Sequence, residues 1–179
     1  MPDVVNVVFE THALTEDNEN GIGTGWNPGR LSAAGREQAR LLGERRRGDG
    51  IAAIFASDLG RALDTVSIAF GDADIPIFHD WRLRECNYGD LNGTEDALVQ
   101  PASYIASPYP EGESWTEAID RVLSFVPDLC RWRGQRVLVV GHAATGRALY
   151  RYATGKTVEE LMSEPFTWQP GWEYVFRVE

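Results

Sequence analysis

Two of the three histidines in this 179-residue sequence stand at equivalent positions, each just past a run of apolar residues. His12 follows the valine-rich stretch at residues 4–9, and His142 follows RVLVVG at residues 136–141. Such stretches are typical of buried parallel strands, and ligands bind beyond the carboxyl ends of those strands. A neutral imidazole placed there can act as a nucleophile or exchange a proton. We therefore expect the two histidines to share one pocket; the alternative is two unrelated loop histidines.

Three further side chains are candidates for the same pocket. Arg61 falls in the first turn of a helix predicted to open at about Asp58, where an arginine opposes the helix dipole and so suits the binding of an anion. Glu85 and Asn18 lie in predicted loops, where each taken alone is also compatible with an ordinary solvated residue. His79 ends another predicted strand without comparable neighbours, and we expect it to be structural.

The elements that must position these residues alternate between strand and helix. We expect strands at 4–9, 51–57, 75–80, 136–141 and 171–178, and a long binding loop at 12–31. Helices are predicted after Ser32, after Asp58, over 114–132 with a bend or last turn at Pro127, and over 144–154 with Gly155 as its stop. This order predicts a three-layer α/β/α sandwich with a mostly parallel sheet.

Ser32 is a suitable N-cap for the helix that follows it. The apolar and neutral residues of this helix at helical spacing predict an inward face made of Ala34, Gln38, Leu41 and Leu42. The charge run ERRRGDG ends this helix, with arginines where the helix dipole favours them.

Charge and composition limit the partners. The formal net charge is −10, which makes nucleic acid and anionic membranes poor partners, although a small anionic substrate remains compatible with a locally positive cleft. Cys86 and Cys130 show no close-spaced pairing, which fits a reducing cytoplasm. We expect neither a signal peptide nor a membrane span, and we expect a single domain over residues 1–179.

Six motifs in the right order resemble the histidine phosphatase superfamily, which includes the cofactor-dependent phosphoglycerate mutases. Where that family opens with RHGETxxN, residues 11–18 read THALTEDN and keep His12, Thr15 and Asn18. The resemblance runs from residue 4 to about 150. The other motifs are LSAAGREQA at 31–39, SDLGRALDT at 57–65, LRECNYGDLNG at 83–93, PEGES at 110–114 and GHAATGRAL at 141–149.

The resemblance implies a phosphoglycerate mutase-like fold and a mechanism without metal or cofactor. His12 would attack phosphorus, Arg61 and His142 would stabilise the transferring group, and Glu85 would move the proton of the leaving oxygen and then of water. Further substrate contacts would come from Thr11, Asn18 and the backbone of Ala143.

The sequence departs from the family beside the predicted nucleophile. Thr11 stands where the family has an arginine, and Ala13 and Leu14 replace the usual glycine and glutamate. Losing one charge-assisted hydrogen bond costs roughly ten- to a hundredfold in rate or binding. Arg84 or Arg30 is a candidate to supply the missing charge.

The combined interpretation is a cytoplasmic phosphatase that hydrolyses a small phosphorylated metabolite through a phosphohistidine. The alternatives are a phosphotransferase or mutase with an unusual substrate, and a catalytically weak binding or regulatory protein. Five aromatic residues fall in loops or helix starts near the predicted pocket, where they either pack under the loops or stack on a substrate ring: Trp26, Tyr88, Tyr104, Tyr109 and Trp115. The sequence does not specify the substrate or the oligomeric state.

Overall fold

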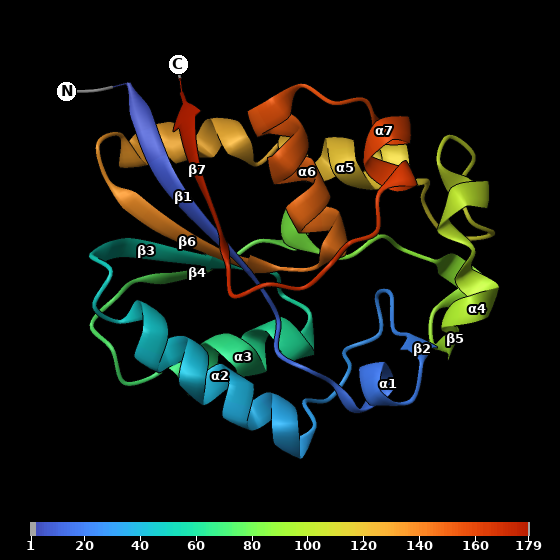
Figure 1. Cartoon of the computed structure of the whole chain (residues 1–179), viewed down its shortest axis with the longest axis horizontal. Coiled ribbons are helices and arrows are strands. Elements are labelled where there is room, and N and C mark those ends of the chain that lie inside the picture. The colour runs from blue at the N-terminus through green and yellow to red at the C-terminus, as the bar shows by residue number, and fades with distance from the viewer. Residues whose placement is uncertain (1–2, 179) are drawn as a thin grey trace.

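The centre of the molecule is a five-stranded sheet, in a computed structural model that describes residues 3–178 (Figure 1). Four strands are parallel and the edge strand β7 is antiparallel to β1. The strands lie in the order β4 (Ile77–His79), β3 (Ile51–Ala56), β6 (Arg136–Gly141), β1 (Val4–Thr11) and β7 (Trp172–Arg177). All five strands predicted from the sequence are present, and the mostly parallel α/β fold is confirmed.

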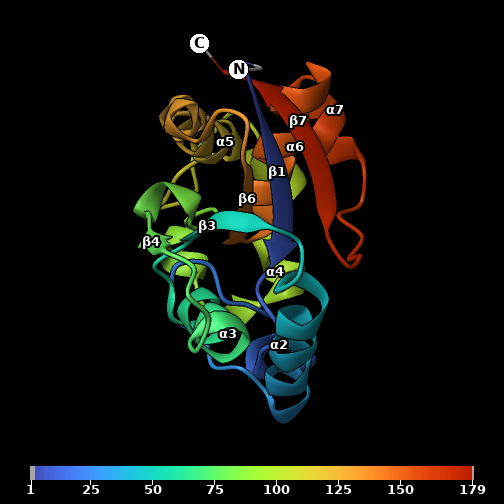
Figure 2. The ribbon, with the colours of Figure 1, turned by 90° about the vertical axis from the view of Figure 1, so that its left-hand side faces the viewer.

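Helices cover both faces of the sheet (Figures 1 and 2). One face carries α2 (Ala33–Arg46) and α3 (Gly60–Phe70), and the other carries α5 (Trp115–Leu123), α6 (Ala143–Thr154) and α7 (Val158–Ser163). Pro127 follows the end of α5 and lies in a separate 3₁₀ helix at Val126–Trp132, as its missing N–H favours. Gly155 ends α6 with a positive φ of 73°, as predicted.

Two apolar cores follow from this layering, because alternate residues of a strand face opposite sides of the sheet. On the α5, α6 and α7 side, Val5, Val7 and Phe9 of β1 pack with Ile119 and Leu149. On the other side, Val8 packs with residues of α2 and α3, which include Leu42, Val66 and Phe70. Both cores hold the end of β1 in place.

The inward face predicted for α2 is wrong. Ala34, Gln38 and Leu41 are exposed, and of the four predicted residues only Leu42 is buried. The helix instead buries a stripe that includes Gly35 and Gly43. A Cβ on Gly35 would lie 1.8 Å from the carbonyl oxygen of Leu14, and one on Gly43 would lie 2.4 Å from that of Ala69. Backbone therefore packs against backbone, which an apolar pattern does not reveal.

The remaining elements frame the far end of the sheet. They include the short helices α1 (Glu16–Glu19) and α4 (Asp96–Val99) and a two-stranded sheet of β2 (Ile22–Gly23) and β5 (Thr94–Glu95). Three short 3₁₀ helices complete the loops, at Trp81–Leu83, Gly89–Leu91 and Pro101–Tyr104. Figure 1 shows α1, β2, β5 and α4 grouped beyond the carboxyl end of β1. The short elements and α7 were not predicted from the sequence.

Candidate active site

The two strand-end histidines meet because their strands are neighbours in register. Thr11 of β1 pairs with Gly141 of β6, and the N–H of His12 donates to the carbonyl of Gly141 at 2.8 Å. The next residue of each strand is therefore a histidine at the same edge. The ring centroids of His12 and His142 lie 5.0 Å apart.

The hydrogen bonds of His12 fix which of its ring nitrogens carries the proton. Its Nδ1 lies 2.7 Å from the carbonyl oxygen of Ala13, which only accepts, so Nδ1 carries the proton and Nε2 keeps its lone pair. Burial, followed by the nearby charge of Arg61, lowers the pKa of His12 to about 3. The imidazole is neutral at neutral pH, which is the form that a nucleophile requires.

Arg61 supplies a buried cation beside that nitrogen. Its Nε lies 3.3 Å from Nε2 of His12, and its two terminal nitrogens donate to the carbonyl oxygens of Asn27 and Gly25 at 2.7 and 2.9 Å. These contacts fix the guanidinium plane before any ligand binds, so little side-chain freedom is left to lose.

His142 is buried with unused hydrogen-bonding capacity. Its side chain is buried, and neither ring nitrogen has a partner among the described residues. Burial, and then the charge of Arg61, hold the pKa of His142 well below its usual range. Buried polar atoms without partners are uncommon, and this histidine is one of the residues that line the pocket.

Glu85 reaches the same pocket from the loop after β4. Its carboxylate accepts from the backbone N–H groups of Cys86 at 2.9 Å, Ala144 at 3.0 Å and Ala143 at 3.2 Å. Two of these donors open helix α6, whose dipole favours a negative charge at that end. The Ala143 amide predicted to contact the substrate thus donates to Glu85.

Thr11 and Asn18 also line the pocket. The Thr11 hydroxyl is buried and has no partner among the described residues. The side-chain oxygen of Asn18 accepts from the N–H of Thr15 at 3.1 Å, which closes the turn before α1. The structure thus brings together all seven predicted site residues.

Thr145, which sequence reasoning missed, joins the two loops of the site. Its hydroxyl accepts from the N–H of His142 at 3.0 Å and donates to the carbonyl of Leu83 at 2.8 Å. A Cβ on Gly141 would lie 2.3 Å from that hydroxyl oxygen. The glycine before the second histidine therefore makes room for Thr145, a reason invisible without the fold.

Arg121 and Trp26 hold the Glu85 loop and were not predicted to do so. The Arg121 guanidinium donates to the carbonyl of Glu85 at 3.0 Å and to the carboxylate of Glu113. The indole N–H of Trp26 donates to the same Glu85 carbonyl at 2.7 Å. These contacts position Glu85 without touching the pocket between the histidines.

Neither Arg84 nor Arg30 replaces the arginine that the family has at the position of Thr11. Arg84 forms a two-pronged ion pair with Asp58, with both N–O distances at 2.7 Å, and Arg30 is exposed on the loop before Ser32. The aromatic residues mainly pack under the loops, as the first alternative held: Tyr88, Tyr109 and Trp115 are buried, and Tyr104 stacks on Tyr109 at 3.9 Å. His79 is exposed at the end of β4, away from the pocket.

The pocket itself has a volume of about 290 Å³ and one wall that the sequence did not predict. Phe166 and Trp168 form that wall, from the segment between α7 and β7. The other lining residues are Thr11, His12, Leu14, Asn18, Gln38, Glu85, His142 and Ala143.

This arrangement agrees with a comparison of the sequence with known families. The sequence model of the histidine phosphatase superfamily (branch 1) matches residues 7–168. The chain belongs to this superfamily. The matched residues include the predicted nucleophile His12, the second histidine His142 and the loop that carries Glu85.

Several known proteins are similar to this chain at moderate sequence identity. The 2,3-bisphosphoglycerate-dependent phosphoglycerate mutase of Methylobacterium sp. (strain 4-46) is 33% identical over 176 residues, which cover 87% of this chain and 83% of that protein. The structure of YhfR from Bacillus stearothermophilus superposes with a TM-score of 0.84 at 28% identity and covers 98% of this chain and 92% of that one. A mycobacterial glucosyl-3-phosphoglycerate phosphatase in complex with VO3 gives 0.78 at 25% identity, covering 89% and 85%.

Residues 3–178 contain neither a membrane-spanning helix nor a cluster of metal-binding side chains. No helix within residues 3–178 has the length and apolar character needed to span a bilayer. In the same range, no group of three or more His, Cys, Asp or Glu side chains is arranged to hold a metal ion.

Proposed function

We propose that this protein is a phosphatase that hydrolyses a small phosphomonoester in two steps through a phosphohistidine on His12. The proposal rests mainly on a neutral His12 whose Nε2 keeps its lone pair and accepts from Nε of the fixed Arg61 guanidinium at 3.3 Å. Membership of the superfamily supports the same assignment.

In the first step, Nε2 of His12 forms a bond to phosphorus while the bond from phosphorus to the ester oxygen breaks. Glu85 delivers a proton to that leaving oxygen. Arg61 and an N–H of His142 donate to the equatorial oxygens, where charge is spread in the transition state.

In the second step, water attacks the phosphohistidine and gives a proton to Glu85. The bond from nitrogen to phosphorus breaks, inorganic phosphate leaves and His12 regains its lone pair. We assign no metal to either step, and hydrolysis should be unchanged by a chelator.

Rapid quenching with a labelled phosphomonoester tests the intermediate. The parent should trap an acid-labile, alkali-stable phosphoprotein, and His12→Ala should trap none while melting near the parent. His79→Ala removes an exposed histidine outside the pocket and should label like the parent. Substantial turnover by a folded His12→Ala variant would exclude the covalent mechanism.

A mutase or phosphotransferase is the second candidate, because similar curated proteins include phosphoglycerate mutases. The same phosphohistidine would then pass its phosphoryl group to an acceptor hydroxyl. Release of inorganic phosphate in step with substrate loss supports the phosphatase, whereas conversion of substrate to an isomer without phosphate release supports the mutase.

A further inference from the structure

The pocket beside the two histidines is poor in positive charge. Apart from the histidines, Glu85 is the only residue with an ionisable side chain among those that line it, and no lysine or arginine lines it within residues 3–178. Arg61 is buried against His12 and is not among the lining residues, and the proposed function assigns its charge to the phosphoryl group. A second anionic group on the substrate would therefore face a carboxylate without a cation.

The arginines around the pocket are already paired. Each makes an ion pair or donates to backbone carbonyls: Arg45 to Glu10, Arg84 to Asp58, Arg121 to Glu113, and Arg147 to the carbonyls of Leu161 and Glu164. Recruiting Arg84 would leave Asp58 without its cation, which is costly in a partly buried place. Arg45 borders only the smaller adjoining cavity, and Glu10 would keep Arg46 as a partner if Arg45 moved.

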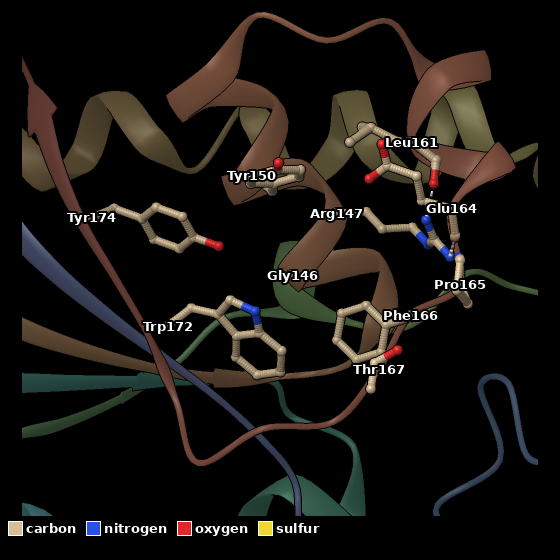
Figure 3. Close-up of a pocket in the computed structure, with 10 residues that line it drawn as sticks. All are labelled: Gly146, Arg147, Tyr150, Leu161, Glu164, Pro165, Phe166, Thr167, Trp172 and Tyr174. Carbon is tan, nitrogen blue, oxygen red and sulfur yellow. Dashed lines mark hydrogen bonds between the residues drawn. The ribbon is translucent and has the colours of Figure 1, made fainter.

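The wall formed by Phe166 and Trp168 is aromatic, and Phe166 is held by packing. Phe166 stacks on Trp172 at 5.5 Å, and Trp172 packs on Phe9 of β1 at 5.2 Å. Phe166 also lies over Gly146, where an added Cβ would come within 2.8 Å of its ring. Figure 3 shows the far side of this wall, where Phe166 and Trp172 face a second cavity bordered by α6.

Both ends of the segment that carries the wall are fixed. At its start, Arg147 donates to the carbonyl of Glu164 at 3.1 Å, as Figure 3 shows. At its end, Arg46 donates to the carbonyl of Pro170 at 3.2 Å and pairs with the buried Glu10 at 2.8 Å. The wall is thus anchored to β1, the strand that carries His12.

Trp168 is the part of this wall that a ligand can still cover. Its side chain is 60% exposed, yet it lines the pocket and a smaller adjoining cavity beside Thr11 and His12. A large aromatic surface left open at the mouth of a pocket favours an apolar partner. Leu14 adds a second apolar contact, while the neutral amides of Asn18 and Gln38 line the same space.

We infer that the alcohol portion of the substrate is uncharged and presents a flat apolar face, and that Trp168 and Phe166 select it. The inference rests on the proposed phosphatase function. A phosphate ester that carries a carboxylate or a second phosphate should be a poor substrate, because the pocket lining offers no cation for the second anionic group.

The test compares esters of similarly basic alcohols: benzyl phosphate, glycerol 3-phosphate and 3-phosphoglycerate. The kcat/KM for benzyl phosphate should exceed that for glycerol 3-phosphate by about tenfold or more, and 3-phosphoglycerate should be the poorest. Trp168→Ala should lower kcat/KM for benzyl phosphate by about five- to tenfold and change glycerol 3-phosphate by less than about twofold. Trp168→Phe should restore most of the loss.

Leu98→Ala is the matched control, because it removes a similarly exposed apolar side chain from α4 that is not part of the pocket. Its kinetics should equal those of the parent. Equal losses on both esters in Trp168→Ala, or a preference for 3-phosphoglycerate, would overturn the inference while His12-dependent hydrolysis left the proposed function intact.

Binding of benzylphosphonate, which is not hydrolysed, tests the selectivity of the pocket independently of phosphatase activity. Calorimetry should show tighter binding of benzylphosphonate than of methylphosphonate, and Trp168→Ala should remove most of the difference. That result in a protein without phosphatase activity would support the pocket chemistry and overturn the proposed function. Equal affinities for the two phosphonates would overturn the pocket chemistry.

Discussion

The Nε atom of Arg61 lies 3.3 Å from Nε2 of His12, and the same guanidinium lowers the pKa of both pocket histidines. Burial is the larger cause in each case. The arrangement keeps the two rings neutral in the free protein. It also couples the stability of the fold to pH, because an unfolded chain protonates its histidines freely.

Acidification should therefore lower the free energy of unfolding, because the unfolded chain takes up protons on both histidines more readily than the folded protein does. A base whose pKa is lowered by folding binds more protons when unfolded, so stability is full above pH 6.5 and falls as the pH drops below it, for His12 down to about 3. His142→Gln removes one such group. The difference in unfolding free energy between parent and variant should shrink by up to about 2 kcal/mol from pH 7 to pH 5. Urea unfolding at both pH values measures it, and a constant difference would contradict the coupling.

Glu85→Gln should reduce activity in a way that depends on the leaving group. The amide cannot exchange the proton, and general acid–base catalysis contributes roughly 10²–10⁴-fold. We expect a loss in that range for an alkyl phosphate and a much smaller one for 4-nitrophenyl phosphate, whose leaving oxygen needs no proton. Because one variant is assayed with two substrates, any structural damage affects both. Equal losses would remove Glu85 from the proton-transfer role.

Much of the site was predictable because it depends on strand order and not on side-chain packing. Parallel strands end at one edge of a sheet, so the residues after 4–9 and 136–141 had to gather there if those strands were close. The pairing of Thr11 with Gly141 makes them adjacent. Thr145, by contrast, acts only through contacts across the fold, and its sequence position offers no signal for them.

The buried face of α2 shows where sequence patterns fail in physical terms. Hydrophobic periodicity reports where side chains are buried, whereas Gly35 and Gly43 mark a face where the backbone itself is in contact. The wall formed by Phe166 and Trp168 was not predicted from the sequence for a related reason. Its segment has no regular structure, and its position is set by Arg46 and Arg147 from distant parts of the chain.

Gly35→Ala tests the close packing of α2. The new methyl group would meet the carbonyl of Leu14 at 1.8 Å, and overpacking of this kind costs about 1–3 kcal/mol. Gly48→Ala is the matched control, since its Cβ would have nothing within 4 Å. The control should stay within about 0.5 kcal/mol of the parent or gain slightly in unfolding free energy. If both variants unfold alike in urea, the helix contact is not as tight as described.

Thr11→Arg tests whether the pocket still receives a phosphate in the orientation proposed here. Among the described residues the buried Thr11 hydroxyl has no hydrogen-bond partner, and Thr11 lines a pocket of about 290 Å³. A guanidinium there would donate to phosphate oxygens from the side of His12, which should tighten inhibition by vanadate or inorganic phosphate by roughly ten- to a hundredfold.

Bulk has to be separated from charge in this experiment. Thr11→Met has a long but uncharged side chain, so any change that it shares with Thr11→Arg comes from volume, whose cost is about 1–3 kcal/mol when a site is full. Only variants that melt near the parent are informative. Tighter anion binding in Thr11→Arg but not in Thr11→Met supports a phosphoryl group held between Thr11, His12 and Arg61. Unchanged anion binding in a well-folded Thr11→Arg, with no gain on any phosphomonoester, would mean that the pocket no longer binds phosphate in this way. The transferase and binding-protein hypotheses would then replace the phosphatase.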